Sequence, residues 1–110
     1  MDIRPINDTV GVTGQIQPED LAALAARGFK SVVCNRPDGE DAAQPAFAEI
    51  ETAAKAAGLE IRYIPVTHAG ITEEQVSAFR AALDDMPKPL LAFCRSGARS
   101  ASLHAATRGA

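Results

Sequence analysis

The sequence predicts an α/β domain with a central, mostly parallel sheet of roughly four to five strands flanked by helices. Short apolar runs that are typical of buried strands alternate with segments whose apolar residues recur at helical spacing. Glycine or proline separates most of these segments, and no internal repeat or low-complexity linker interrupts them. Such an alternation favours parallel strands with helices packed on both faces of the sheet.

The first half of the chain contains two predicted strands around one helix. Residues 1–7 are expected to be a poorly anchored lead-in to a short strand at 9–12. A helix is predicted after Pro18, which suits a first helical position, and Gly28 is a good helix stop. The apolar run that follows predicts a buried strand over 29–35.

The second half repeats this order, with turn-forming residues between the elements. A capping box formed by Thr72 and Gln75 marks the start of one helix. The predicted elements are a polar loop over 36–44, a helix over 45–58, a strand over 59–66, a loop over 67–70, a helix from Thr72, a break at 87–89, a strand over 90–93 and a helix over 101–106. Ligands bind beyond the carboxyl ends of parallel strands, so residues 34–38, 67–70 and 94–99 are expected to meet.

Composition limits what the protein does. We expect one domain over residues 1–110, with an aliphatic core, because 46% of residues are hydrophobic and none is tryptophan. The net charge of −3 argues against a nucleic-acid binder, and no stretch is apolar and long enough to cross a membrane. The first residues lack the apolar run of a signal peptide, and the chain has two cysteines. We therefore expect a cytoplasmic protein with reactive thiols rather than disulfides.

The segment around Cys94 carries the clearest chemical signal. An apolar run at 90–93 leads directly into this cysteine, and a small polar loop then enters an alanine-rich helix. Free backbone N–H groups at such a helix start form an anion-binding nest, which also favours a thiolate. Arg99 adds a fixed cation for an oxyanion, and the Ser100 hydroxyl is expected to donate to the Cys94 sulfur. The predicted anion-binding loop comprises Arg95, Ser96, Gly97 and Ala98.

The segment 94–100 resembles the active-site loop of rhodanese-type sulfurtransferases and the phosphate-binding loop of cysteine-dependent phosphatases. The rest of the chain resembles the phosphatase-like domain of beta-lactamase-hydrolase-like proteins, a bacterial family also regarded as sulfurtransferase candidates. The matching stretches lie at 12–15, 28–33, 35–40 and 64–66 as well as in the loop itself. The resemblance implies a fold like that of dual-specificity cysteine phosphatases.

The spacing of the loop favours sulfur transfer. Four residues separate Cys94 from Arg99, as is usual in rhodaneses, whereas tyrosine and dual-specificity phosphatases have one more. Phe93 stands where phosphatases often have histidine, and residues 66–71 contain no Asp or Glu to act as a general acid. We therefore expect a sulfurtransferase that forms a persulfide on Cys94. The alternative is a phosphatase-like hydrolase acting through a cysteinyl-phosphate, and the third hypothesis is a module that binds an anion or persulfide without turnover.

Four further residues are accessory candidates. Cys34 is expected in the core, and the sharper hypothesis is that it pairs with Cys94 or relays sulfur. Arg36 and Asp38, together with Glu40, belong either to a solvated turn with an internal Arg–carboxylate pair or, as the resemblance implies, to the border of the active site. His68 is an exposed loop histidine or, in the functional hypothesis, a proton donor to a leaving group.

The expected partners are small molecules. They are an anionic substrate, either a sulfane sulfur donor or a phosphoester, and a thiol acceptor. The histidines and cysteines lack metal-ligand spacing, so neither a metal nor another cofactor is expected. Relatives fused to other domains imply a metallo-hydrolase or persulfide dioxygenase partner. The resemblance also implies a truncated or minimal C-terminus, which leaves open whether a partner subunit covers Leu103.

Overall fold

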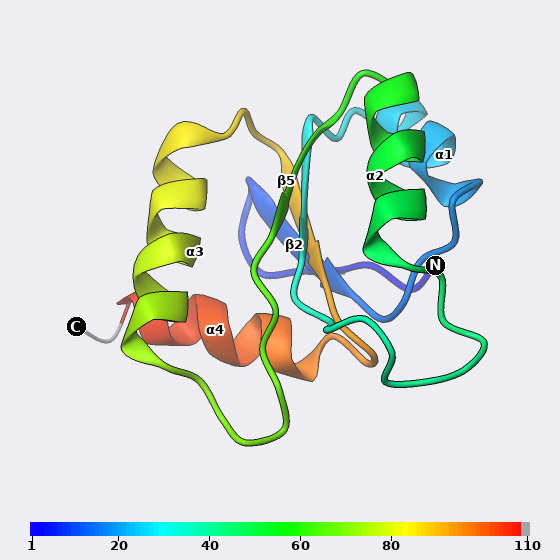
Figure 1. The fold of residues 1–110 in the computed structure, drawn as a ribbon. Helices are drawn as coiled ribbons and strands as arrows, with labels where there is room; N and C mark the ends of the chain where they lie inside the picture. The colour runs from blue at the N-terminus through cyan, green and yellow to red at the C-terminus, as the bar shows by residue number, and fades with distance from the viewer. Residues whose placement is uncertain (109–110) are drawn as a thin grey trace.

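The computed structural model describes residues 1–108, which form a five-stranded sheet between two layers of helices (Figure 1). The strands are β1 Arg4–Pro5, β2 Val10–Thr13, β3 Ser31–Cys34, β4 Glu60–Tyr63 and β5 Leu90–Phe93. The helices are α1 Asp20–Ala26, α2 Phe47–Ala56, α3 Glu73–Asp85 and α4 Ala98–Arg108. The predicted α/β class with a mostly parallel sheet is confirmed.

The strand order places β5 at the centre of the sheet. The order is β1-β2-β5-β3-β4, and only the pairing of β1 with β2 is antiparallel. The register aligns the carboxyl ends, because Thr13 of β2 and Cys34 of β3 both lie opposite Phe93 of β5. The segments that follow these three strands therefore emerge at one edge of the sheet, as predicted from the order of elements.

Each face of the sheet has its own hydrophobic cluster. Leu91 and Phe93 pack with Leu21 of α1 and Ile50 of α2, whereas the neighbouring positions of β5 face α3 and α4. Figure 1 shows these helix pairs on opposite sides of the sheet. A central strand buried on both faces must be apolar at every position, which explains the continuous run at 90–93.

The start of α3 is fixed by local hydrogen bonds. The Thr72 hydroxyl accepts from the Gln75 backbone N–H at 3.2 Å, and the Gln75 side-chain oxygen accepts from the Thr72 N–H at 2.8 Å. The predicted capping box is therefore confirmed. It satisfies two N–H groups that the first turn of any helix leaves without intrahelical partners.

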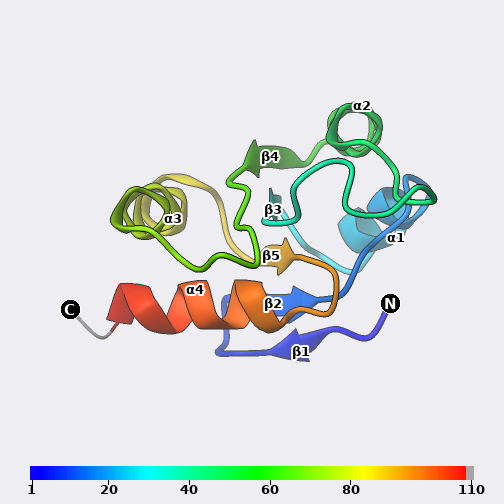
Figure 2. The same ribbon diagram turned by 60° about the horizontal axis from the view of Figure 1, so that its bottom comes forward.

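The prediction of a poorly anchored segment at residues 1–7 is wrong. Arg4 and Pro5 pair with Val12 and Gly11, so that β1 lies along the outer edge of β2 (Figure 2). The physical reason is that β2 would otherwise present an open edge of unpaired backbone groups. The pairing matters for function, because it brings the side chain of Arg4 to the carboxyl end of the sheet.

The last helix also differs from expectation. It begins at Ala98 rather than at residue 101, so its first turn follows the cysteine loop directly. Leu103 is fully buried and packs in the cluster that contains Phe79 of α3. Its apolar side chain is therefore covered within this chain. Among residues 1–108, no helix has both the length and the apolar character that a membrane crossing requires.

Replacing Leu103 with alanine tests this packing. Leu103→Ala should lower the free energy of unfolding by about 3 kcal/mol, because it leaves a cavity between α3 and α4. The control is Ser102→Ala on the exposed side of the same helix, which should change stability by less than about 0.5 kcal/mol. Urea unfolding of both variants gives the comparison, and equal effects would contradict the packing described.

Candidate active site

Cys94 lies at the centre of the carboxyl edge of the sheet. It follows β5 directly, its side chain is buried, and its backbone N–H donates to the Thr13 carbonyl at 3.4 Å. The loop to α4 then turns sharply at Gly97, whose φ of 93° favours glycine. In this turn the Gly97 N–H points back at the Cys94 sulfur, 3.0 Å away.

A second glycine lets the loop rest on the end of β2. A Cβ on Gly14 would come within 2.9 Å of the Arg95 carbonyl oxygen, a distance that side chains do not tolerate. The Gln15 N–H donates to the same oxygen at 3.3 Å. The close contact with β2 therefore holds the loop backbone in place without using a side chain.

The loop favours the ionised form of Cys94. Burial by itself raises the pKa of this thiol, but four backbone N–H groups outweigh the burial and hold its pKa below the ordinary value. These N–H groups belong to Ser100, Ser96, Arg99 and Gly97. They lie at the N-terminus of α4 or just before it, where the helix dipole also favours negative charge. The predicted nest for an anion therefore surrounds the sulfur.

Arg99 is held by Glu40, whose loop the family resemblance placed at the border of the site without a role for this carboxylate. Its guanidinium donates to both oxygens of Glu40, at 2.7 and 2.8 Å, and to the Val66 carbonyl at 2.7 Å. These three bonds use both Nη1 donors and one Nη2 donor of the five that arginine carries. Nε and the second Nη2 hydrogen remain for an oxyanion. Glu40 raises the pKa of Arg99 most, and the nearby Cys94 sulfur contributes as well.

Glu40 is the centre of a charged cluster. Its carboxylate also lies 3.0 Å from Nε of Arg36 and 3.8 Å from Nε2 of His68. Arg36 is buried and donates in addition to the Gln15 side chain at 3.1 Å. The hydrogen bond from Arg99, followed by that from Arg36, lowers the pKa of Glu40 to about 2 even though burial opposes the shift. The loop after β3 therefore borders the site, as the family resemblance implied for Arg36.

Ser100 does not make the hydrogen bond that the sequence predicted. Its buried hydroxyl donates to the Asn35 side-chain oxygen at 2.8 Å and not to the Cys94 sulfur. Asn35 in turn donates to the Ile64 carbonyl at 2.9 Å. The first turn of α4 directs this hydroxyl toward β3, so only the backbone N–H of Ser100 acts on the thiol. Ser100 thus ties α4 to the sheet.

Two other candidates have structural positions. The Asp38 carboxylate accepts the backbone N–H of Phe47 at 2.8 Å, one of the N–H groups at the start of α2 that have no intrahelical partner. Cys34 packs in the cluster beneath α1 and α2, and burial raises the pKa of its thiol to about 12. Both cysteines are free. Cys34 therefore has the core position expected of it, and its pairing with Cys94 stays an untested hypothesis.

The rest of the loop is open to solvent. Arg95, Ser96 and Ala98 are exposed, whereas Gly97 is buried. His68 is also exposed, with 74% of its side chain accessible. It lines a cavity of about 320 Å³ beside Arg99, together with Val66, Thr67, Gly70, Ile71, Ala98 and Ser102. This cavity therefore lies directly beside the guanidinium of Arg99.

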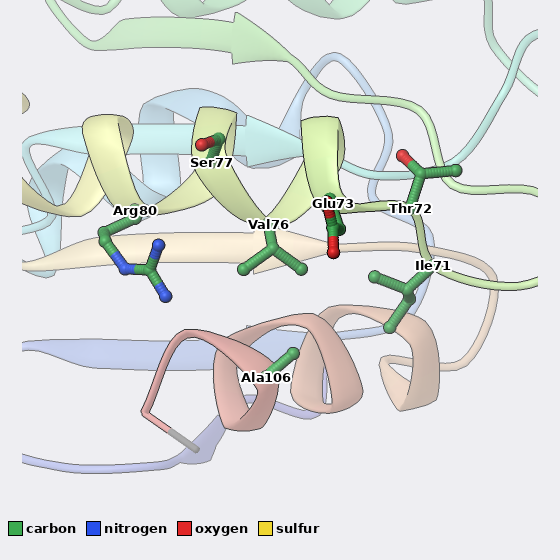
Figure 3. Close-up of a pocket in the computed structure, with 7 residues that line it drawn as sticks. All are labelled: Ile71, Thr72, Glu73, Val76, Ser77, Arg80 and Ala106. Carbon is green, nitrogen blue, oxygen red and sulfur yellow. The ribbon is translucent and has the colours of Figure 1, made fainter. Parts of the chain in front are cut away.

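A larger cavity lies away from the sulfur. It has a volume of about 610 Å³ and lies between α3 and α4, where Ile71, Val76 and Arg80 point toward Ala106 (Figure 3). Neither Cys94 nor Arg99 lines it. Within residues 1–108, no cluster of three or more His, Cys, Asp or Glu side chains has the arrangement needed for a metal ion.

Comparison of the whole sequence with known protein families gives a match over almost its full length. Residues 2–110 fit the family model for the phosphatase-like domain of beta-lactamase hydrolase-like proteins. The chain belongs to this family. A beta-lactamase hydrolase-like protein from Agrobacterium fabrum is 37% identical over 99 residues, which are 90% of this chain and 23% of that protein. The chain therefore spans about a quarter of the length of such relatives.

Solved structures give the same picture of the fold. A Neisseria meningitidis protein named as a candidate phosphatase is 32% identical with a TM-score of 0.88, over 100% of this chain and 80% of that one. The core catalytic domain of an S. cerevisiae PP-IP phosphatase is 17% identical with a TM-score of 0.68, and the match covers 97% of this chain and 68% of that one. The predicted phosphatase-like fold is therefore confirmed. The family and the Neisseria protein favour the phosphatase-like alternative over sulfur transfer.

Glu40→Gln tests the charged cluster. The change should lower the free energy of unfolding at neutral pH by about 3 kcal/mol, because Arg36 and Arg99 lose a partly buried partner. The lowered pKa means that Glu40 stabilises the fold fully above its ordinary pKa of 4.5, and that this contribution is lost as the pH falls toward about 2.

The stability difference between the wild type and Glu40→Gln should therefore be largest at neutral pH and shrink below about pH 4.5. Urea unfolding of both proteins across this range measures it. Glu51→Gln, on the exposed side of α2, is the control and should show little difference at any pH. A pH-independent difference for Glu40→Gln would refute the assigned ion pairs.

Proposed function

We propose that this domain is a cysteine-dependent hydrolase of phosphate monoesters. One observation carries the proposal: the Cys94 sulfur lies in a nest of backbone N–H groups beside a guanidinium that Glu40 holds by one edge. The free edge of Arg99 offers two parallel donors, which match two oxygens of a phosphoryl group. Membership of a phosphatase-like family supports the same chemistry.

The first step transfers the phosphoryl group to sulfur. The Cys94 thiolate attacks phosphorus, an S–P bond forms, and the P–O bond to the alcohol breaks. Loop N–H groups and the free edge of Arg99 stabilise the charge on the equatorial oxygens. The imidazolium of His68, 3.8 Å from the Glu40 carboxylate, donates the proton that the leaving alkoxide needs.

The second step returns the enzyme to its starting state. Water attacks phosphorus in the cysteinyl-phosphate, the S–P bond breaks, and inorganic phosphate leaves. The neutral imidazole of His68 takes the proton from the water, which restores the imidazolium, and the sulfur leaves as the thiolate. The nest that favours ionised Cys94 makes the sulfur a better leaving group in this step.

Sulfur transfer is the second candidate, and the length of the loop favours it. Four residues between Cys94 and Arg99 make a tight ring that suits one terminal sulfur. In this reaction the thiolate attacks the outer sulfur of thiosulfate, the S–S bond breaks, and sulfite leaves with the bonding electrons. The Cys94 persulfide then yields its outer sulfur to a thiolate acceptor, which restores Cys94.

Intact-mass spectrometry separates these candidates. The protein is incubated with p-nitrophenyl phosphate or with thiosulfate, and each sample is measured with and without an added thiol. Phosphate release with a trapped phosphoryl adduct on Cys94 supports the proposal. A gain in mass of one sulfur that the added thiol removes, without phosphate release from the phosphoester, contradicts the proposed phosphatase activity and supports sulfur transfer. Neither adduct, combined with tight anion binding, indicates a binding module.

Cys94→Ser should abolish turnover of p-nitrophenyl phosphate, with a loss of about 10³-fold or more, because it removes the nucleophile. The matched control is Cys34→Ala, which removes the other thiol and should retain most of the activity. Phosphate release is measured by a colorimetric assay. Full turnover by Cys94→Ser would exclude both covalent mechanisms.

His68→Asn should affect substrates according to their leaving groups. The value of kcat/KM, which covers the steps up to transfer of the phosphoryl group to sulfur, should fall by about 10²-fold for phenyl phosphate, because phenolate needs a proton, and should change little for p-nitrophenyl phosphate. The ratio of kcat/KM for the two substrates is the measurement. A ratio equal to that of the wild type would exclude His68 as the general acid while leaving the role of Cys94 intact.

A further inference from the structure

One peptide group links the Cys94 sulfur to a residue near the N-terminus. The N–H of the Ser96–Gly97 peptide donates to the Cys94 sulfur at 3.0 Å. The carbonyl of the same peptide accepts from Nη2 of Arg4 at 2.9 Å. The peptide unit is planar and trans, so its N–H and C=O point in opposite directions. A bond that holds the carbonyl outward therefore aims the N–H inward at the sulfur.

The fold brings Arg4 to this position from the far end of the sequence. Arg4 pairs with Val12 in the antiparallel β1–β2 ladder. β2 in turn neighbours β5, whose carboxyl end leads into the loop. Figure 2 shows β1 alongside β2, as the outermost strand of the sheet. Arg4 and Ser96 are 92 residues apart in sequence, and their contact depends on this pairing.

The packing around Gly97 leaves space for the guanidinium and for little else. A Cβ on Gly97 would collide with Nη2 of Arg4 and would lie 3.3 Å from the Thr13 carbonyl. Glycine at this position therefore has two consequences. It allows the positive φ that turns the N–H toward the sulfur, and it lets Arg4 approach the loop backbone closely.

We propose that Arg4 is a positioning residue for the Cys94 thiolate, acting through the Ser96–Gly97 peptide. Its charge-assisted hydrogen bond fixes the orientation of the peptide and draws electron density toward the carbonyl, which makes the N–H a stronger donor to sulfur. Arg4 therefore favours the ionised thiol without touching the sulfur or the substrate. This inference rests on the proposed function only in that Cys94 acts as a thiolate, which both candidate reactions require.

The direct test is the pKa of the Cys94 thiol in the whole protein. Alkylation by iodoacetamide is followed against pH by intact mass, since only the thiolate reacts. The core position and raised pKa of Cys34 keep that residue out of the measurement. Arg4→Met retains the unbranched apolar stem of the side chain and removes the guanidinium donors. It should raise the Cys94 pKa by about 0.5–1 unit.

The other charged or titratable groups near the sulfur stay the same in this variant. They include Arg95 in the loop, Arg99 on α4, Cys34 on β3, and Glu40 with its partners Arg36 and His68. The control is Arg27→Met, which removes an exposed arginine at the end of α1, beside the residues that lead into β3 and β5. It should leave the Cys94 pKa unchanged, because solvent and salt screen so distant a charge.

A second variant keeps the test decisive if Arg4→Met fails to fold. Arg4→Gln preserves a neutral donor and should give a smaller rise in the same pKa. A folded Arg4→Met or Arg4→Gln protein with the wild-type pKa would overturn the proposal. Because the readout is ionisation and not turnover, the proposal for Arg4 and the proposed phosphatase activity fail independently.

Discussion

The site depends on placing a thiolate inside the protein without leaving its charge uncompensated. Cys94 is buried, and burial alone would raise the pKa of its thiol above the ordinary value. Backbone N–H groups of the loop and of the first turn of α4 outweigh burial and hold the pKa of this thiol below that value. Those groups converge because β5 ends at the centre of the carboxyl edge and because Gly97 turns the chain back over the sulfur. The central strand, the glycine turn and the helix start therefore form one functional unit.

The second requirement is an arginine that is held firmly and is still available to an anion. Glu40 takes one edge of the Arg99 guanidinium, and the Val66 carbonyl takes another donor. An exposed ion pair of this kind contributes little, but this one is mostly shielded from solvent, with 14% of the Arg99 side chain and 16% of the Glu40 side chain exposed. Arg36 adds a further bond to Glu40. The same carboxylate lies beside His68 and so connects the anion site to the candidate proton donor.

The residues predicted for the site from sequence fall into two groups in the structure. Some act on the Cys94 sulfur, and others hold the surrounding elements in place. Ser100 and Asp38 belong to the second group, because their side chains bind Asn35 and the start of α2. A serine next to the arginine of such a loop has the right sequence position for catalysis. The direction of its side chain is set by the helix, however, and no spacing rule contains that information. Glu40 illustrates the opposite case, since its sequence context is that of an ordinary polar turn.

The sequence by itself determined the local chemistry: an apolar strand, Cys94, a glycine turn and a helix start within a dozen or so residues. Local propensities and the orphan N–H groups of a helix start suffice for that prediction. Tertiary structure decided which distant side chains complete the site. Glu40 lies 59 residues from Arg99 in sequence, and Arg4 lies 92 residues from Ser96. Strand order and register bring these groups together, and they arise from the packing of the whole sheet, which no local pattern encodes.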